Sequence, residues 1–139
     1  MNLVIDTSFI MSAVLPDEKN IEVDAIYDKI LDNTYSLHVP AIFYLECQNT
    51  LMMAVKRNRI TMLQYDEYIQ VLGLLPINVD RFCSIHESLY LISKFSSKHG
   101  LSAYDTSYLE LAIRLSCPIA TFDKKLIASA TLENIALII

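Results

Sequence analysis

Residues 100–126 read GLSAYDTSYLELAIRLSCPIATFDKKL and hold a helix, a strand and the start of a second helix in close succession. Ser102 is a good N-cap residue, and apolar residues then recur at helical spacing to about residue 116. The apolar run 118–121 is expected to form a strand, followed by a short helix over 123–130. A short apolar strand between two helices is typical of a parallel sheet covered by helices.

The rest of the chain repeats this alternation of short apolar strands and amphipathic helices. Further strands are predicted over residues 2–5, 36–40, 76–80 and 134–139. Further helices are predicted over residues 20–32, 41–57, 61–73 and 82–98, with Gly73 and Gly100 closing the last two. The sequence therefore predicts an α/β fold in one domain, residues 1–139. Its sites are expected beyond the carboxyl ends of the parallel strands.

The composition is that of a globular protein with a substantial core. Of 139 residues, 53% are hydrophobic and 19% are charged, which excludes a disordered chain. With only 2 glycines, the chain has no glycine-rich phosphate loop, and nucleotide-binding folds of that kind are excluded. The cysteines and histidines lack the spacing of a zinc site. Because no signal peptide or membrane span is found, the cytoplasm is the expected location.

The net charge of −5 comes from the N-terminal part of the chain, where residues 1–32 carry seven acids and two bases. This segment is either a solvated acidic helix face or an acidic surface that docks a basic partner. The chain lacks the overall positive charge of proteins that bind nucleic acid by charge alone. Any such contact would need a local basic patch. The candidates are Lys56, Arg57 and Arg59, and separately Lys124 with Lys125.

Two aspartates directly follow predicted strands. Asp6 comes after the strand 2–5, where the chain is expected to turn, and Asp123 comes after the strand 118–121. Each could simply be a turn or N-cap residue, which is a common role of aspartate. Since the carboxyl ends of parallel strands meet at one edge of a sheet, each is also a candidate site residue.

Asp105 lies inside the predicted helix that Ser102 begins. It shares a helix face with Tyr108, so it is expected to point toward the packed side or its edge. Ser102 and Asp105 also approximate a capping box, in which Asp105 has only a structural role. The polar face of this helix is expected to carry Thr106, Glu110 and Arg114.

Glu46 is an acid flanked by apolar residues in the segment AIFYLEC, residues 41–47. Exposure to solvent on an amphipathic helix is one interpretation. The other is a polar patch, because Asn49 and Thr50 lie on the same side of the predicted helix.

Acids that converge at one sheet edge need a compensating charge. Two carboxylates about 4 Å apart repel each other by about 4 kcal/mol at an effective dielectric constant near 20. A cluster therefore persists only if some members are protonated or a cation lies among them. Oxygen-only ligands favour Mg²⁺ or Mn²⁺, and such an ion can orient a water nucleophile at a phosphodiester. The pattern indicates metal-dependent phosphoryl chemistry.

Three segments form an ordered set of motifs: VIDTSFI (4–10), PAIFYLECQNTL (40–51) and the stretch 100–126. The first has an Asp followed two residues later by Ser. The second has a glutamate followed three residues later by Asn49, and the third has an aspartate helix followed by a T-x-D strand end. Together they resemble the PIN-domain ribonucleases and, within them, the VapC-type toxins of bacterial toxin–antitoxin pairs.

The resemblance implies a role for each motif residue. The implied catalytic residues are Asp6, Ser8, Glu46, Asp105, Thr121 and Asp123. Asp6 and Asp105 would be the principal ligands of Mg²⁺, for which Mn²⁺ could substitute. Glu46 and Asp123 would complete the acidic cluster, directly or through water. The two hydroxyl residues would orient the carboxylates or bound water by hydrogen bonding.

The resemblance also implies a fold, a reaction and partners. The fold would be a three-layer α/β/α sandwich with a mostly parallel central sheet. The reaction would be hydrolysis of an RNA phosphodiester bond without a covalent enzyme intermediate. The partners would be the RNA substrate, a cognate antitoxin protein that blocks the site, and a second copy of the chain in a homodimer.

Other functions stay open at this point. The main alternative is a non-catalytic PIN-like module that binds RNA or protein. A phosphatase of the haloacid-dehalogenase type would use Asp6 as its nucleophile, but it needs an aspartate where this chain has Ser8. Tyr104 and Tyr108 flank Asp105 and could stack RNA bases, with packing in the core as the alternative.

Overall fold

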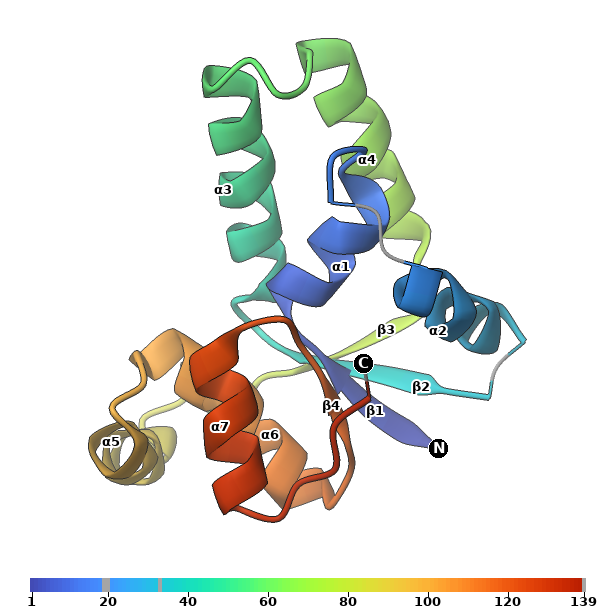
Figure 1. Ribbon diagram of the computed structural model, residues 1–139. Helices are drawn as coiled ribbons and strands as arrows, with labels where there is room; N and C mark the ends of the chain where they lie inside the picture. The colour runs from blue at the N-terminus through green and yellow to red at the C-terminus, as the bar shows by residue number, and fades with distance from the viewer. Residues whose placement is uncertain (19–20, 33, 139) are drawn as a thin grey trace.

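The computed structural model describes residues 1–18, 21–32 and 34–138, and its strands form one sheet. The strands are β1 (Asn2–Ile5), β2 (Ser36–Pro40), β3 (Ile77–Asp80) and β4 (Ile119–Ala120). They lie in the order β3-β2-β1-β4, and each neighbouring pair is parallel (Figure 1). Their carboxyl ends therefore meet at one edge of the sheet.

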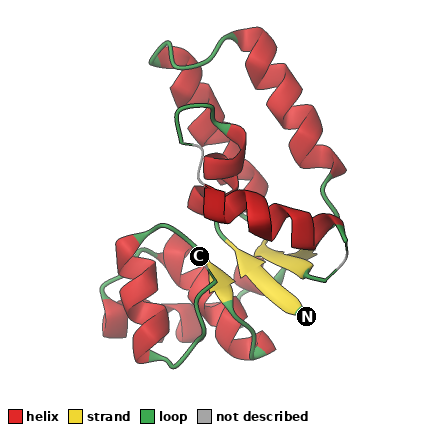
Figure 2. Ribbon diagram, turned by 45° about the vertical axis from the view of Figure 1, so that its right-hand side comes forward, coloured by secondary structure: helices red, strands yellow, loops and turns green. Residues whose placement is uncertain are grey.

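Helices cover both faces of this sheet (Figures 1 and 2). They are α1 (Thr7–Val14), α2 (Ile21–Leu31), α3 (Phe43–Lys56), α4 (Met62–Leu74), α5 (Ser88–His99), α6 (Ala103–Leu115) and α7 (Lys124–Leu132). Helix α6 packs against β1, β2 and β4 and contacts α5 and α7, whereas α1 contacts α2 and α3. Helices α3 and α4 rise from the sheet as a hairpin. The arrangement is the predicted three-layer α/β/α sandwich.

The core is built on the two central strands. Leu3, Val4 and Ile5 of β1 are fully buried, as are Leu37 and Val39 of β2. Both faces of β1 are covered, which explains why its apolar residues follow one another without alternation. The buried strand ends at Ile5, and Asp6 follows directly at its carboxyl end. No helix within the described ranges is long and apolar enough to cross a membrane.

Two predictions about helix boundaries were wrong. The chain does not form an open turn at residues 6–8, because α1 begins at Thr7 as soon as β1 has ended. Gly73 does not close its helix, since α4 continues to Leu74 and Leu75 is the C-cap. Gly100 does close α5, in the left-handed conformation that glycine adopts without a steric penalty.

Two other predicted segments are also shorter or more broken than expected. Residues 82–98 form a 3₁₀ helix (Phe82–Ser84) and then α5, rather than one helix. The expected strand 134–139 is reduced to a single bridge between Ile119 and Leu137 in the part that is described. Residues 20 and 139, at the ends of two predicted elements, lie outside the described residues.

Two of the three residues expected on the polar face of α6 are buried, and only Arg114 is exposed, which corrects part of a further prediction. Thr106 and Glu110 are 0% and 2% exposed. The Glu110 carboxylate accepts a hydrogen bond from Arg114 Nε at 2.7 Å, and the same guanidinium binds Asp80, at the end of β3, at 2.8 Å. The i,i+4 ion pair is therefore present. Since Arg114 also binds Asp80 of β3, these side chains connect α6 to the sheet.

Candidate active site

Asp6 lies at the carboxyl end of β1 and is the N-cap of α1. Its Oδ1 accepts hydrogen bonds from the Phe9 N–H at 2.9 Å and from Ser8 Oγ at 2.8 Å, and its Oδ2 accepts one from Thr121 Oγ1 at 2.6 Å. The side chain is thus an N-cap and also the centre of a network that joins two strand ends. Its carboxylate is fixed in orientation by three separate donors.

Burial has a large effect on Asp6, which is 6% exposed. Desolvation raises the pKa of its carboxyl to about 6, although hydrogen bonds from Thr121, the Phe9 N–H and Ser8 act in the opposite direction. The negative charge of Asp123 raises this pKa further. A nearby cation would favour the charged form of this group.

Thr121 and Asp123 lie beside Asp6 because β1 and β4 pair in parallel, with Ile5 opposite Ala120. Thr121 Oγ1 accepts a hydrogen bond from the Asp123 N–H at 3.0 Å while it donates to Asp6. Asp123 is the N-cap of α7, since its Oδ1 accepts from the Leu126 N–H at 2.8 Å. The parallel pairing therefore brings the first and last motifs together.

Glu46 comes from the first turn of α3 and is partly buried. Its Oε2 accepts hydrogen bonds from Thr7 Oγ1 at 3.1 Å and from the Tyr108 hydroxyl. Desolvation raises the pKa of Glu46, the hydrogen bonds from Tyr108 and Thr7 oppose that rise, and the charge of Asp105 adds to it. Burial and the Glu46 carboxylate likewise raise the pKa of the Tyr108 phenol.

Asp105 lies in the first turn of α6, which Ser102 caps. Ser102 Oγ accepts from the Asp105 N–H at 3.0 Å and donates to Asp105 Oδ2 at 2.6 Å. The predicted pairing of these two residues is present, but the carboxylate binds the Ser102 hydroxyl. Asp105 is partly buried, between the exposed Tyr104 and the buried Thr106.

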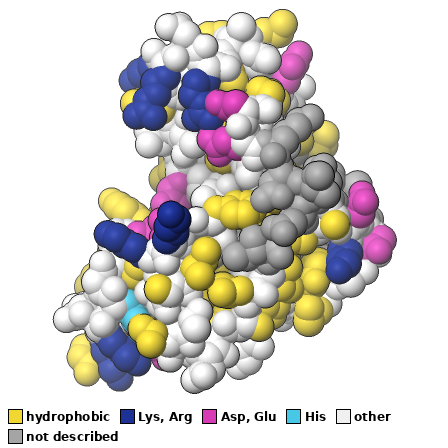
Figure 3. All heavy atoms as spheres, viewed as in Figure 1, with side chains coloured by type: hydrophobic (Ala, Val, Ile, Leu, Met, Phe, Trp, Pro, Cys, Tyr) yellow, Lys and Arg dark blue, Asp and Glu magenta, His cyan; other side chains and the backbone are white. Residues whose placement is uncertain are grey.

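One pocket of about 340 Å³ brings these acids together. Its walls include the four predicted acids: Asp6, Glu46, Asp105 and Asp123. Ser8 also lines the pocket, whereas Thr121 contributes through its bond to Asp6. In Figure 3 acidic side chains gather in the indentation between the α3–α4 hairpin and the lower helices, beside basic ones. The acids are far apart in the sequence and meet only in the folded chain.

Five side chains that line this pocket are not among the predicted site residues: Thr7, Met11, Glu18, Thr50 and Tyr108. Glu18 follows α1 and is held by Arg59 at 2.5 Å, and no pattern in the sequence points to it. Thr7 lies inside the D-T-S motif, but the motif does not predict that its hydroxyl donates a hydrogen bond to Glu46. Tyr108 packs in the core, which is one of the two interpretations of this residue from the sequence, and its hydroxyl binds Glu46.

The donor set has the chemistry of a hard cation site, because the pocket offers carboxylate and hydroxyl oxygens. No three acidic, histidine or cysteine side chains among the described residues already form a ready-made set of metal ligands. Mg²⁺ usually binds through one or two carboxylates and keeps several waters. The four acids of this pocket therefore suit a Mg²⁺ ion that binds one or two of them directly and the others through water.

Comparison with known proteins identifies the family. The family model of the PIN domain matches residues 3–132. The chain belongs to the PIN-domain family. This PIN domain is similar to Ribonuclease VapC3 of Pyrobaculum aerophilum, with 24% identity over 131 residues that cover 91% of this chain and 92% of the relative. The resemblance stated from the motifs is therefore confirmed.

Solved structures share the fold of this PIN domain. FitAcB from Neisseria gonorrhoeae superposes with a TM-score of 0.66 and 21% identity, covering 99% of this chain and 96% of that one. VapBC2 from Rickettsia felis, bound to a DNA fragment from its promoter, superposes with a TM-score of 0.68 and 13% identity. That match covers 99% of this chain and 97% of the other. The fold predicted from the sequence is thus the fold of these proteins.

Proposed function

We propose that this PIN domain is a magnesium-dependent endoribonuclease that hydrolyses RNA phosphodiester bonds. The observation that carries the proposal is the single pocket lined by Asp6, Glu46, Asp105 and Asp123. Family membership and the similarity to a protein named as a ribonuclease support it. The oxygen donors of the pocket are of the type that binds Mg²⁺, with Mn²⁺ as a substitute.

In this proposal Asp6 and Asp105 hold the cation, and Glu46 and Asp123 act on it directly or through water. When bound, the cation would lower the pKa of a water molecule and neutralise charge on the attacked phosphate. Ser8 and Thr121 hold the Asp6 carboxylate in one orientation, so little reorganisation is needed when a ligand binds.

Glu46 is the side chain best suited to exchange a proton with the attacking water. It is partly buried, and desolvation together with the charge of Asp105 raises the pKa of its carboxyl. Enzymes use carboxyl groups with raised pKa values in general acid–base catalysis. The hydroxyls of Thr7 and Tyr108 bind the same oxygen, Oε2. In this proposal the other oxygen, Oε1, faces the reacting groups.

The biological role that we propose is that of a toxin in a type II toxin–antitoxin pair, acting in the cytoplasm. The names VapC3 and VapBC2 among its relatives support this role. The partners would be RNA, a cognate antitoxin protein that covers the acidic pocket, and a second copy of the chain in a homodimer.

The test is cleavage of a labelled single-stranded RNA in Mg²⁺ by the wild type, Asp6→Asn and Asp105→Asn. Each variant should lose at least about a hundredfold in rate, because each removes a charge that the cation needs. Asp66→Asn, on the exposed surface of α4, is the matched control and should cleave normally. EDTA should stop the wild-type reaction, and Mn²⁺ should restore it.

Full cleavage by either site variant would contradict the proposal. A wild type that binds RNA but cleaves none of several RNAs, with either ion, would instead favour a non-catalytic module. Circular dichroism of each variant shows whether the fold is intact, so loss of activity is not confused with unfolding.

A further inference from the structure

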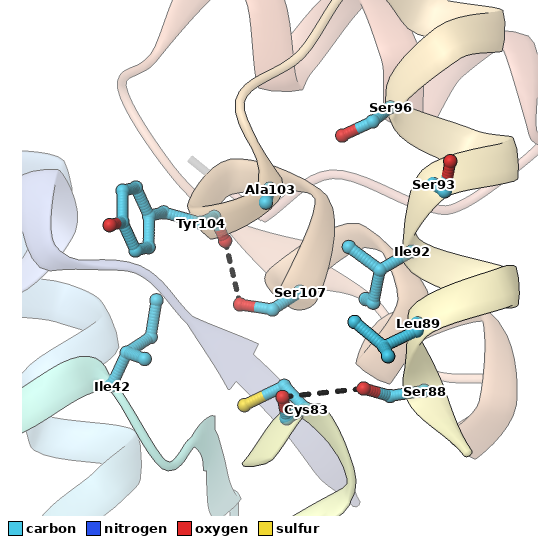
Figure 4. Close-up of a pocket in the computed structure, with 10 residues that line it drawn as sticks. All are labelled: Ile42, Cys83, Ser88, Leu89, Ile92, Ser93, Ser96, Ala103, Tyr104 and Ser107. Atoms are coloured by element: carbon cyan, nitrogen blue, oxygen red, sulfur yellow. Dashed lines mark hydrogen bonds between the residues drawn. The ribbon is translucent and has the colours of Figure 1, made fainter. Parts of the chain in front are cut away.

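A second pocket opens between α5 and the first turn of α6, and its volume is about 440 Å³ (Figure 4). Its apolar walls come from Leu89 and Ile92 of α5, from Ile42 just before α3, and from Tyr104 of α6. The Tyr104 ring lies across the pocket from α5. The volume is within the range of sites that hold small organic groups.

This apolar pocket adjoins the acidic pocket, because residues that are close along the chain line the two pockets. Tyr104 lines the apolar pocket, and the next residue, Asp105, lines the acidic one. In α3 the Glu46 N–H donates to the Ile42 carbonyl at 3.1 Å, so these two residues are one helical turn apart, about 5.4 Å along the axis. A polymer whose phosphate lies in the acidic pocket can therefore place a neighbouring group in the apolar one.

The two tyrosines beside Asp105 have different environments. Tyr108 is 2% exposed and binds Glu46, so it is part of the packed interior. Tyr104 is 63% exposed at the edge of the apolar pocket. An aromatic face in such a position can stack with a base of any sequence.

The pocket also contains polar atoms suited to the edge of a base. The Ser107 hydroxyl donates its proton to the Tyr104 carbonyl at 2.6 Å, which leaves its oxygen to accept a hydrogen bond. Ser93, an exposed residue of α5, lines the same pocket. Apolar walls for the ring faces and a few hydroxyls for the edge are the features by which proteins bind unpaired bases.

We propose that the apolar pocket receives an unpaired nucleobase of the RNA strand, next to the phosphate that is cut, and that Tyr104 is its stacking platform. The inference rests on the proposed ribonuclease function and adds a binding site for the substrate. The position of Tyr104, directly before Asp105, favours a group carried by the substrate over a side chain from a partner protein.

The test measures binding without cleavage, in the Asp6→Asn background with Mg²⁺. Fluorescence anisotropy would give the Kd for an adenosine oligomer of about 12 nucleotides and for an abasic oligomer of the same length. Tyr104→Ala should weaken binding of the adenosine oligomer about fivefold or more and leave the abasic oligomer unchanged. Tyr104→Phe should retain the affinity, and Ser93→Phe, which fills the pocket, should lose it.

Tyr90→Ala is the matched control, because Tyr90 is an 80% exposed tyrosine on α5 that does not line the pocket. Unchanged affinity for the adenosine oligomer in Tyr104→Ala and Ser93→Phe overturns the inference. The proposed function would survive that result if Asp6→Asn still abolishes cleavage in an otherwise wild-type chain.

Sedimentation of the same variants separates a base site from a protein interface. The inference expects Tyr104→Ala to keep the wild-type molecular mass. A change of mass caused by Tyr104→Ala would make the pocket an interface between protein chains and overturn the inference. A wild type that neither binds nor cleaves RNA overturns the proposed function and this inference together.

Discussion

Asp6 shows how one residue can serve the fold and the site together. It caps α1 through the Phe9 N–H and accepts hydrogen bonds from the hydroxyls of Ser8 and Thr121. The two interpretations that the sequence left open, cap or site residue, therefore do not exclude each other. A capping aspartate at the end of a parallel strand already lies at the edge where sites form.

Burial of Asp6 gives the metal-free protein a pH-dependent stability. The pKa of its carboxyl is about 6 in the folded protein against an ordinary value of 3.8, so the folded state binds this proton more tightly. The contribution is fully present below about pH 4 and is lost as the pH rises through about 6. In EDTA the free energy of unfolding should fall by up to about 3 kcal/mol across this window.

Urea unfolding between pH 4 and pH 7.5 measures this effect. Asp6→Asn keeps a capping side chain but has no proton to titrate, so it should show a smaller decline than the wild type. Identical pH profiles for the two proteins would show that Asp6 is not the group responsible.

Local patterns pointed to the four acids that line the pocket, and they missed other residues there, such as Glu18. Asp6 and Asp123 follow apolar strands directly, and Glu46 and Asp105 interrupt apolar helix segments. Glu18 lies after α1 in a part of the chain with several acids, so no local pattern distinguishes it. It reaches the pocket through the path of the chain and its bond to Arg59, which is distant in sequence.

At the scale of elements, the first turn of α6 positions Asp105. The Ser102 hydroxyl satisfies the Asp105 N–H and also binds its carboxylate. The cap therefore fixes both the start of the helix and the direction of the acid. Through Tyr108, one turn further along, α6 also reaches Glu46 on α3.

Ser102→Ala should lower the free energy of unfolding by about 1 kcal/mol, because the helix no longer has its N-cap side chain. It should also weaken Mn²⁺ binding, since the hydroxyl that orients the Asp105 carboxylate is removed. Chemical denaturation and calorimetric titration measure the two effects. Ser97→Ala, at an exposed position inside α5, is the control and should change neither. An unaltered stability in Ser102→Ala would be inconsistent with this role of the cap.

Helical and strand periodicity predicted most elements, and the exceptions have physical causes. Helix α1 was missed because Phe9, Ile10, Met11 and Ser12 are all buried, so no polar side marks a helical period. The face of α6 with Glu110 was predicted as polar, but Arg114, which also binds Asp80, satisfies that carboxylate within the protein. Pairing with a distant strand is not visible in a local pattern.

For the whole molecule, the proposed function requires an acidic protein to hold an acidic RNA. Arg59 was a candidate for binding RNA, but it is engaged by Asp17 and Glu18. Lys124 and Lys125 are exposed at the start of α7, directly after Asp123. They are therefore the basic residues best placed to contact the RNA backbone near the acidic pocket.

Changing Lys124 and Lys125 to Gln in the Asp6→Asn background should weaken RNA binding equally for all sequences. The slope of log affinity against log salt concentration should fall in magnitude by about 1.4, or about 0.7 for each single-strand phosphate that is no longer neutralised. Titrations at several salt concentrations measure this slope. Lys29→Gln, on the exposed surface of α2, is the control for a simple change in net charge. An unchanged slope in the double variant would place the RNA elsewhere.

A crystal structure of the protein soaked in Mn²⁺, with anomalous diffraction to locate the ion, would show directly whether the four acids share a cation. We expect Mn²⁺ inside the acidic pocket, bound by oxygens of Asp6 and Asp105, with Glu46 and Asp123 bound to it directly or through water. An acidic pocket that holds no Mn²⁺ at saturating concentration, or Mn²⁺ bound only at other places on the protein, would contradict this expectation.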